Sequence, residues 1–284
     1  MNTILPHFQS QQRQGQDDGQ HHLSLEARVR ELKKGLASLE LGEAVGSLTL
    51  ADNNEDVGVS ELEEEIGNLL VHFIDATVAS DATSDLQESV DRVMALIAAF
   101  GITYSTEVAT KIMERAMEFS TVLLERIRGH ACVLLGKIAK TLLEMKRNKK
   151  NTEEDLEWIE DCLEQVLEAL VPRLQDKGQA VRCHAITAVG NVFATAEDVE
   201  NYETVLEALM WSVSHDPSVS NRIAAVQSVP VNEKTLDVII SRVRDVKPKV
   251  RAEALHALRT KVEDATELSE QQIVDLIQYG FTDR

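Results

Sequence analysis

The stretch RLQDKGQAVRCHAITAVG, residues 173–190, contains a pattern that returns twice further along the chain. When the aspartates of the three copies are aligned, an arginine follows six positions later, an alanine nine positions later, and aliphatic residues ten and thirteen positions later. The aligned residues are Asp176, Asp216 and Asp245; Arg182, Arg222 and Arg251; Ala185, Ala225 and Ala254; Ile186, Val226 and Leu255; and Val189, Val229 and Leu258. Matching columns in three copies indicate an internal structural repeat.

Each copy is predicted to be a helix hairpin, with the aspartate in the turn and the arginine near the start of the second helix. An aspartate before a helix can accept from the free N–H groups of the first turn, and the arginine is placed to reach the aspartate of a neighbouring copy. The alanines allow close helix packing, and the aliphatic columns are expected to be buried. We therefore expect a structural ladder without a catalytic role, formed by Asp176, Arg182, Asp216, Arg222, Asp245 and Arg251.

The remainder of the chain from residue 60 is also predicted to be helical. Successive copies of the pattern begin 40 and 29 residues apart, in or below the range of two-helix solenoid repeats. Upstream and downstream of the copies, an N-cap residue is followed three positions later by an acidic or amide residue at Ser60 with Glu63, Ser84 with Gln87, Thr152 with Asp155, and Ser269 with Gln272. No window shows strand alternation. The predicted class is all-α, an α-solenoid of HEAT-type hairpins over residues 60–284.

The two ends of the chain carry separate expectations. Residues 1–22 are rich in Gln, Asp, Gly and His and are predicted to be a disordered tail, because they have few apolar side chains to bury. Residues 23–59 are predicted to form one amphipathic helix followed by an acidic linker. The closing SEQQIVDLIQYGFTDR, residues 269–284, resembles a first helix without the second helix that would cover it. We expect an array that is cut off mid-repeat, as in a fragment of a longer protein.

Composition narrows the class of protein. Hydrophobic residues make up 43% of the chain and aromatic residues 4%, which favours helices packed through small side chains. Cys132, Cys162 and Cys183 are odd in number and lie in apolar helical patterns, so we expect buried thiols instead of a disulfide or a zinc site. No apolar run approaches the roughly 18 residues of a membrane span, and no secretory signal is present. The sequence predicts a soluble intracellular protein without membrane contact.

Charge is strongly segregated along the chain. The net charge of -19 excludes a polycation that coats nucleic acid over its whole surface. Residues 126–150, however, hold eight basic residues against one glutamate, and residues 151–168 hold eight acidic residues. The basic positions fall at turns and first turns of successive repeats, where they are expected to line one edge of a concave surface and to neutralise phosphates without base recognition. An ordinary solvated face is the alternative. The candidate DNA-backbone contacts are Arg126, Lys137, Lys140, Lys146, Arg147, Lys149, Lys150, Arg242, Arg244, Lys247 and Lys249.

Three patterns imitate ligand sites and are rejected. GHACVLLGK, residues 129–137, has the wrong glycine spacing for a phosphate loop and continues an apolar helical pattern. DNNEDVGVSELE, residues 52–63, resembles a calcium loop but has Val57 where the sharp turn requires glycine. The histidines show no metal-binding spacing. We therefore predict no catalytic, cofactor-binding or metal-binding residue, no small-molecule substrate, and a function that is not enzymatic.

Residues 121–284 resemble the CAP-G family of HEAT-repeat condensin subunits. The resemblance rests on VPRLQDKGQAVRCHAITAVGNV, on SHDPSVSNRIAAVQSVPVNEKTLDVIISRVRDVKPKVRAEALHAL, and on the closing LIQYGFTDR. The junction from SVPVNEKTL to RVRDVKPKVR is the most specific of these. The chain departs from the family at Asn221, which replaces an apolar residue before the repeat arginine. The family's later repeats, which hold most of the kleisin-binding surface, would lie beyond Arg284.

The resemblance implies a curved, non-catalytic subunit of a chromosome-organising complex. Its implied partners are kleisin and SMC subunits, of which the SMC subunits hydrolyse ATP, and double-stranded DNA bound without sequence preference. The implied role is mitotic chromosome condensation, in the nucleus and on chromosomes, with a cytoplasmic pool. A general HEAT adaptor that binds a peptide or helix in its groove stays open as the alternative, and a calcium-regulated enzyme or sensor depends on the imperfect loop at residues 52–63.

Overall fold

The computed structural model describes residues 59–79, 84–195, 202–262 and 268–282. Every secondary-structure element within these ranges is helical, which confirms the all-α prediction. The predicted tail of residues 1–22, and the predicted helix and linker of residues 23–59 apart from its last residue, lie outside the described ranges. Within the described ranges, no helix has the length and apolar character needed to cross a bilayer.

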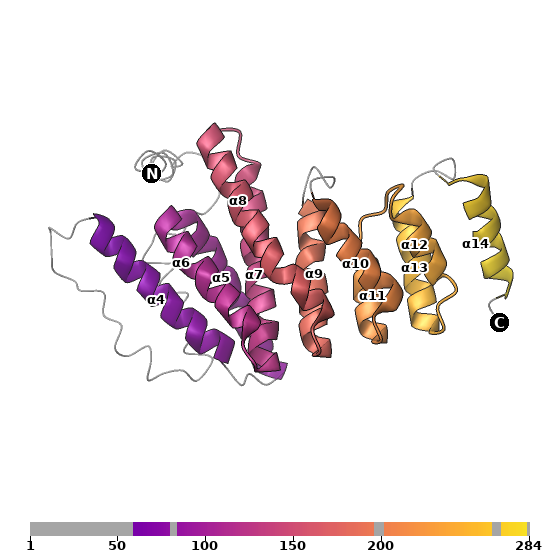
Figure 1. The fold of residues 1–284 in the computed structure, drawn as a ribbon, viewed down its shortest axis with the longest axis horizontal. Coiled ribbons are helices and arrows are strands. Elements are labelled where there is room, and N and C mark those ends of the chain that lie inside the picture. The colour runs from indigo at the N-terminus through magenta and orange to yellow at the C-terminus, as the bar shows by residue number, and fades with distance from the viewer. Residues whose placement is uncertain (1–58, 80–83, 196–201, 263–267, 283–284) are drawn as a thin grey trace. The chain divides into compact units, whose positions relative to one another are not determined.

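The chain divides into two compact units, residues 1–166 and residues 167–284. Unit 1 contains α4 (Val59–Ala79), α5 (Ser84–Tyr104), α6 (Thr106–Thr121), α7 (Glu125–Lys146) and most of α8 (Glu153–Leu170). Unit 2 contains the short 3-10 helix η1 (Val171–Gln175), then α9 (Gln179–Thr195), α10 (Glu203–His215), α11 (Val219–Ser228), α12 (Leu236–Arg242), α13 (Pro248–Lys261) and α14 (Glu270–Thr282). Figure 1 labels the α-helices among them.

Unit 2 is built from two rows of helices. Helix α11 packs between α9 and α13, and these three helices form the second-helix row. Helix α12 packs against α10 and α14, and these form the first-helix row. The two rows are joined within hairpins, since α10 packs on α11 and α12 packs on α13. Hairpins packed in succession are the arrangement of an α-solenoid, as the sequence predicts.

Small residues set the distance between neighbouring hairpins in unit 2. The repeat alanines Ala185, Ala225 and Ala254 are fully buried. At Gly190 on α9, an added Cβ atom would lie 2.4 Å from the Cβ atom of Ser228 on α11. Helices α9 and α11 therefore approach as closely as their backbones allow.

One aliphatic column departs from its expected burial. Ile186 and Val226 are fully buried, but Leu255 in the same column is 45% exposed, so the prediction of a buried residue is wrong at this position. Helix α9 is covered by α11, and α11 is covered by α13, whereas no further helix of that row packs on α13 among the described residues. The column depends on cover from the next hairpin, and the sequence of one copy does not contain that information.

Unit 1 buries its core between α4, α5, α6 and α7. Helix α6 packs against all three others, and α5 also packs against α7. Phe73, Ile97 and Leu134 are among the large side chains that are almost fully buried there. At Gly101 on α5, an added Cβ atom would overlap the side chain of Ile112 on α6. Close helix packing through small residues is thus a property of both units.

Polar side chains close the ends of several helices. In the predicted capping box at α8, the Asp155 N–H donates to Thr152 Oγ1 over 3.1 Å, and the Thr152 N–H donates to Asp155 Oδ2 over 2.8 Å. The corresponding pair at α14 joins Ser269 and Gln272 in both directions. At the end of α4, Arg126 donates to the Ala79 carbonyl, and His130 Nδ1 lies 3.0 Å from the Val78 carbonyl. These contacts satisfy backbone groups that a helix end leaves without partners.

Candidate nucleic-acid interface

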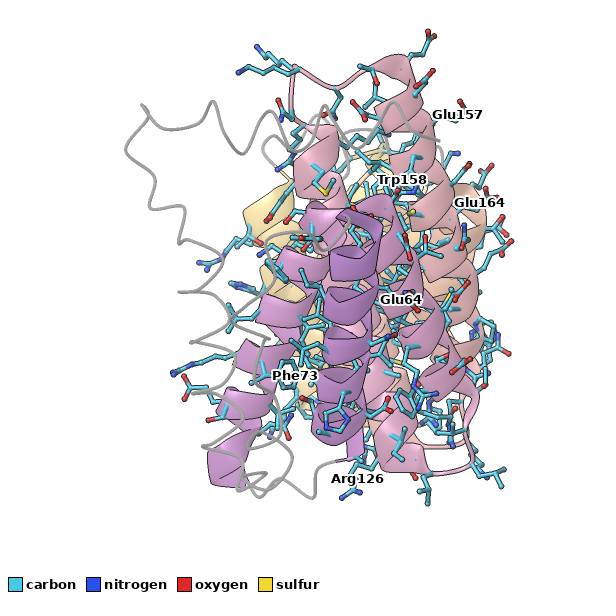
Figure 2. All side chains as sticks on the ribbon, turned by 90° about the vertical axis from the view of Figure 1, so that its left-hand side faces the viewer. Glu64, Phe73, Arg126, Glu157, Trp158 and Glu164 are labelled. Carbon is cyan, nitrogen blue, oxygen red and sulfur yellow. The ribbon has the colours of Figure 1, made fainter. Side chains whose placement is uncertain are left out.

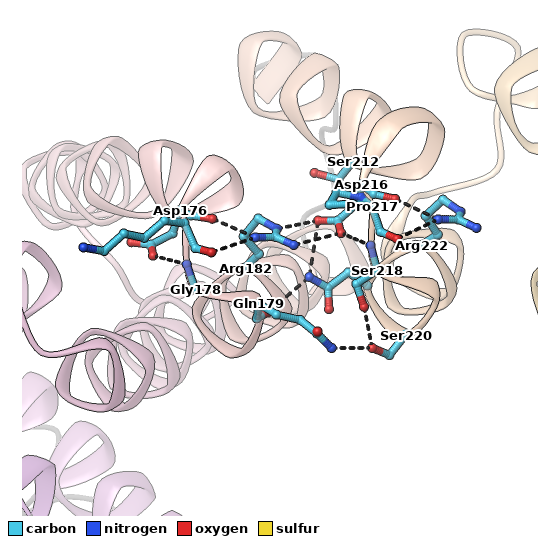
Figure 3. Close-up of polar contacts among 12 residues, drawn as sticks. Asp176, Gly178, Gln179, Arg182, Ser212, Asp216, Pro217, Ser218, Ser220 and Arg222 are labelled. Atoms are coloured by element: carbon cyan, nitrogen blue, oxygen red, sulfur yellow. Dashed lines mark hydrogen bonds and ion pairs between the residues drawn. The ribbon is translucent and has the colours of Figure 1, made fainter.

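Arg182, Asp216, Arg222 and Asp245, four of the predicted ladder residues, form two bidentate rungs between neighbouring hairpins of unit 2. Arg182 on α9 donates through Nε to Asp216 Oδ2 over 2.7 Å and through Nη2 to Asp216 Oδ1 over 3.2 Å. Arg222 on α11 makes the same pair of bonds to Asp245, each 2.9 Å long. Figure 3 shows the first rung, with the arginine of one hairpin meeting the turn of the next.

Each rung is anchored at both ends to the backbone. Arg182, Arg222 and Arg251 donate through Nη1 to the main-chain carbonyl of the aspartate in their own copy, over 2.9, 2.8 and 3.0 Å. The Oδ1 atom of each aspartate accepts from the N–H two residues later, at Gly178, Ser218 and Lys247. The three turns therefore have the same hydrogen-bonding pattern. Because the arginine follows the aspartate by six residues, it can donate to the carbonyl of its own turn and, in the two rungs, to the carboxylate of the next turn.

The surroundings of the rung carboxylates keep them ionised. Burial acts to raise the pKa of Asp216, but hydrogen bonds from Arg182, the Ser218 N–H and Asn221 outweigh it and lower the pKa. For Asp245, burial is likewise outweighed by hydrogen bonds from Arg222 and the Lys247 N–H. Carboxylates that already accept several hydrogen bonds hold hairpins together and are not poised to exchange protons near neutral pH.

Asn221, which departs from the apolar pattern, is fully buried inside the first rung. Its Nδ2 atom donates to the Gln179 carbonyl over 3.1 Å and to Asp216 Oδ2 over 3.3 Å. The side chain thus ties the rung carboxylate to the start of α9. Sequence reasoning identified Asn221 as unusual but assigned it no role, because Gln179 lies 42 residues away in the chain.

Seven of the candidate DNA contacts lie in unit 1, spread along α7 and the connection after it. Arg126, Lys137, Lys140 and Lys146 span a helix of 22 residues, which is about 33 Å long. Figure 2 shows Arg126 at the opposite end of unit 1 from Glu157 in the first turns of α8. Two of the four are already engaged by acidic side chains, since Lys140 Nζ lies 3.8 Å from Glu144 and Lys146 Nζ lies 3.0 Å from Glu160.

The remaining unit 1 candidates belong to one ordered connection. We call Lys146, Arg147, Lys149 and Lys150 the α7–α8 basic turn. Arg147, Lys149 and Lys150 are exposed. Asn151 holds the turn by donating through Nδ2 to the Met145 carbonyl over 2.9 Å, and Asn148 Oδ1 accepts from the Lys150 N–H. The turn therefore presents clustered positive charge from a fixed backbone.

The four unit 2 candidates surround the connection between α12 and α13. Arg242 donates to the Ser214 carbonyl and lies 3.6 Å from Asp245, so it contributes to the second rung. The Arg244 guanidinium lies 4.8 Å from the centre of the Tyr279 ring. We call Arg244, Lys247 and Lys249 the α12–α13 basic turn; all three are exposed, and they flank Val246, which is 81% exposed.

The candidate DNA contacts therefore differ in their surroundings: some lie together in exposed turns, and others are bonded to the backbone or half-buried. The structure brings together the members of each basic turn, which lie in different units. Arg126 and Arg242 donate to backbone carbonyls of their own units, and Lys137 is half-buried in the middle of α7.

Sequence reasoning missed a separation of charge between the two rows of unit 2. The second-helix row, α9, α11 and α13, contains a single acidic residue, Glu253. The first-helix row contains five, which are Glu203, Glu207, Asp237, Glu270 and Asp275. Composition along the chain hides this separation, because helices of the two rows alternate in sequence. Sorting the acidic residues by position within each repeat would have found it.

The patterns rejected as ligand sites have ordinary structural settings where they are described. Residues 129–137 lie inside helix α7, and no group of three or more potential metal ligands occurs among the described residues. The calcium-like stretch lies mainly outside them. Cys132 and Cys162 are buried and Cys183 is half-buried, all as free thiols. Burial, with the nearby Asp161, raises the pKa of Cys162 to about 11, so this thiol is protonated and unreactive.

The fold and the ladder together define a class of protein, the all-α solenoids of HEAT and armadillo type. Within that class, the chain is 29% identical over 162 residues to condensin complex subunit 3 of Homo sapiens. It is 25% identical over 158 residues to condensin complex subunit 3 of Schizosaccharomyces pombe. These similarities confirm the resemblance inferred from the sequence. No protein-family model matches the chain.

The similarity covers part of each protein. The aligned segments make up 56% of this chain, but 14% of the Homo sapiens protein and 16% of the S. pombe protein. The chain therefore spans about one seventh of the curated relatives it matches. Among solved structures, the S. pombe condensin Cnd3–Cnd2 subcomplex matches 90% of this chain and 30% of its own, with a TM-score of 0.61 and 17% identity. At that identity the match establishes the fold.

Proposed function

We propose that this chain acts as a non-catalytic HEAT-repeat subunit of a condensin-like complex in mitotic chromosome condensation. The observation that carries the proposal is the sequence similarity to condensin complex subunit 3 in two distant organisms. The ladder geometry supports it, because a rigid array of hairpins suits a protein that holds partners in place. The proposed location is the nucleus and chromosomes, with a cytoplasmic pool.

Its proposed protein partners are the kleisin and SMC subunits of the complex. The matching solved structure is a subcomplex of two condensin subunits, Cnd3 and Cnd2, which supports binding to at least one other subunit. The SMC partners rest on the family resemblance and supply the ATP hydrolysis that this chain is proposed to lack.

The proposed nucleic-acid partner is the backbone of double-stranded DNA. Support comes from the exposed α7–α8 and α12–α13 basic turns, and from the scarcity of acidic residues on the second-helix row of unit 2. Lysine and arginine at turns contact phosphates without base recognition, so binding is expected to be independent of sequence.

A titration of the whole chain with a fluorescent DNA duplex at several salt concentrations tests this partner. The logarithm of the affinity should fall linearly with the logarithm of salt, with a slope of roughly 0.9 per phosphate contacted. Replacing Lys146, Arg147, Lys149 and Lys150 together by Glu should abolish binding while the helical circular dichroism stays unchanged.

Two milder variants sharpen the assignment. Lys247→Gln with Lys249→Gln should lower both the affinity and the salt slope, by about two contacts. The matched control is Arg92→Gln with Lys234→Gln, which removes the same charge from exposed positions outside both turns and should leave binding nearly unchanged. Equal losses in the two double variants would show that net charge and not the turns determines affinity.

A general HEAT adaptor for a peptide or helix is the second candidate. Leu123 and Leu124, in the connection between α6 and α7, are 89% and 62% exposed, which suits contact with a protein better than contact with phosphate. Capture of a peptide that survives high salt, together with absence of DNA binding, would favour this function over the first.

A further inference from the structure

Thr152 occupies an unusual position beside the α7–α8 basic turn. It is exposed, it directly precedes α8, and its Oγ1 atom accepts from the Asp155 N–H. The four basic residues of the turn lie two, three, five and six positions before it. The hydroxyl therefore stands between clustered positive charge and the start of a helix.

The basic residues nearest to Thr152 on its N-terminal side are accessible without unfolding α8. Lys149 and Lys150 are exposed and lie in the connection between the helices. Protein kinases directed by basic residues bind such side chains in an acidic substrate groove. For the hydroxyl to reach the active site, the capping box, the first turn of α8 and the hydrogen bonds that Asn148 and Asn151 make in the turn have to open, and connections and helix ends open more readily than helix interiors.

We propose that Thr152 is a phosphate acceptor for a serine/threonine kinase directed by basic residues, and that its phosphate weakens DNA binding by the α7–α8 basic turn. The second half of the proposal rests on the proposed function. In the transfer, Thr152 Oγ1 bonds to the γ-phosphorus of ATP while the bond from that phosphorus to the bridging oxygen breaks. ADP leaves, and the hydroxyl proton passes to a base of the kinase.

The charges around Thr152 explain the expected effect. A phosphothreonine adds about -1.5 to -2 charges, which offsets nearly half of the positive charge on the turn. The first turn of α8 carries Glu153, Glu154 and Asp155, which repel the phosphate and favour its contact with the lysines of the α7–α8 basic turn. Since the same lysines guide the kinase and contact DNA, bound DNA should slow phosphorylation, and the phosphate should weaken DNA binding.

The test uses the whole chain, ATP and the catalytic subunit of cAMP-dependent protein kinase, with the modified residue located by mass spectrometry. Thr152 and the variant Thr152→Ser should be phosphorylated. Thr152→Asn, which retains an N-cap side chain, should not be, and Lys149→Gln with Lys150→Gln should react many times more slowly. Thr121 is an internal control, because it is exposed but follows Glu118 at the corresponding position, and it should stay unmodified.

DNA binding gives the second readout. The phosphorylated chain should bind duplex DNA about tenfold more weakly at moderate salt, with a salt slope lower by about one to two contacts. Excess duplex DNA should slow phosphorylation of the unmodified chain several-fold. An unmodified Thr152, or a phosphate that leaves affinity unchanged in a chain that binds DNA, would overturn this proposal and leave the proposed function standing. Failure of the unmodified chain to bind DNA would overturn the proposed function, and with it the regulatory role of Thr152.

Discussion

At the scale of single residues, the second rung of unit 2 is a nearly dry ion pair. The side chains of Arg222 and Asp245 are 9% and 3% exposed and meet through two hydrogen bonds. Removing Arg222 leaves the Asp245 carboxylate buried with only the more distant Arg242, 3.6 Å away, and the Lys247 N–H, and a buried charge that is incompletely paired costs more than the pair contributes when intact. Substitution of the arginine is therefore expected to destabilise unit 2.

We predict that Arg222→Leu lowers the free energy of unfolding by about 3 kcal/mol, because the Asp245 carboxylate stays buried without its partner. Urea denaturation followed by circular dichroism measures the change. The double variant Arg222→Leu with Asp245→Leu should recover part of the loss. Lys234→Gln, at an exposed pair with Glu203, should cause no measurable change. Equal effects of the exposed and buried substitutions would contradict the assignment.

The rung carboxylates also predict how stability changes with pH. The pKa values of Asp216 and Asp245 are lower in the folded protein than their ordinary value, so both groups stabilise the fold when ionised. Their contribution is complete above about pH 4, the ordinary range of an aspartate, and is lost as the pH falls through the lower folded pKa.

Unfolding of the chain by urea should therefore become easier as the pH falls below about pH 4. In Arg182→Gln and Arg222→Gln together, the two carboxylates lose their main stabilising donors, and the dependence on pH in this range should be smaller. A variant with the same dependence as the original chain would place the responsible carboxylates elsewhere.

At the scale of helices, packing in unit 2 depends on close approach of α9 and α11. In an ordinary helix, Gly→Ala stabilises by about 0.5 to 1 kcal/mol. At Gly190 the new Cβ atom would lie 2.4 Å from Ser228 Cβ and 3.0 Å from Ser228 Cα, a distance that forces the two helices apart.

We predict that Gly190→Ala destabilises the chain by about 1 to 3 kcal/mol, because overpacking outweighs the gain in helix propensity. Thermal unfolding measures the sign of the change. Adding Ser228→Gly, which removes the opposing Cβ atom, should restore part of the stability. A stabilised Gly190→Ala variant would mean that α9 and α11 separate without cost.

The sequence predicts these helices well and their surroundings less well. The Asp and Arg spacing identifies the residues of the two rungs, because each copy contains an aspartate for one rung and an arginine for the next. The capping boxes at Thr152 and Ser269 are equally local, and both form. The exposure of Leu255 and the role of Asn221 depend on neighbouring hairpins, and a pattern within one copy does not encode its neighbours.

At the scale of the whole molecule, the positions of the charged residues in the folded structure indicate candidate DNA contacts better than their positions in the sequence. The list of basic residues from the sequence mixes two ordered turns with residues such as Arg126, which donates to the end of α4. Separating them required knowledge of which carbonyls and carboxylates lie nearby. The separation of acidic residues between the rows of unit 2 likewise depends on how the helices pack.

We predict that the tagged chain, recovered from dividing cells after nuclease treatment, brings down condensin SMC and kleisin subunits that mass spectrometry identifies. A matched chain carrying Arg182→Leu and Arg222→Leu, which disrupts the rungs, should recover less of them if the hairpins form the binding surface. Recovery of unrelated proteins with no condensin subunit would favour the adaptor function.

The ladder also sets a rule for how such a chain can lengthen or shorten. Each rung joins an arginine of one hairpin to the aspartate in the turn of the following hairpin, so a rung needs a residue from both hairpins. A duplicated hairpin that carries its own aspartate and arginine six residues apart can be inserted without breaking the series. A hairpin that lacks one of the two residues would leave the charged residue of a neighbouring hairpin unpaired at one junction. Gene duplication can therefore extend this protein by whole hairpins. Each added hairpin must contain an aspartate and an arginine six residues apart, so that it can form a rung with the hairpin on either side.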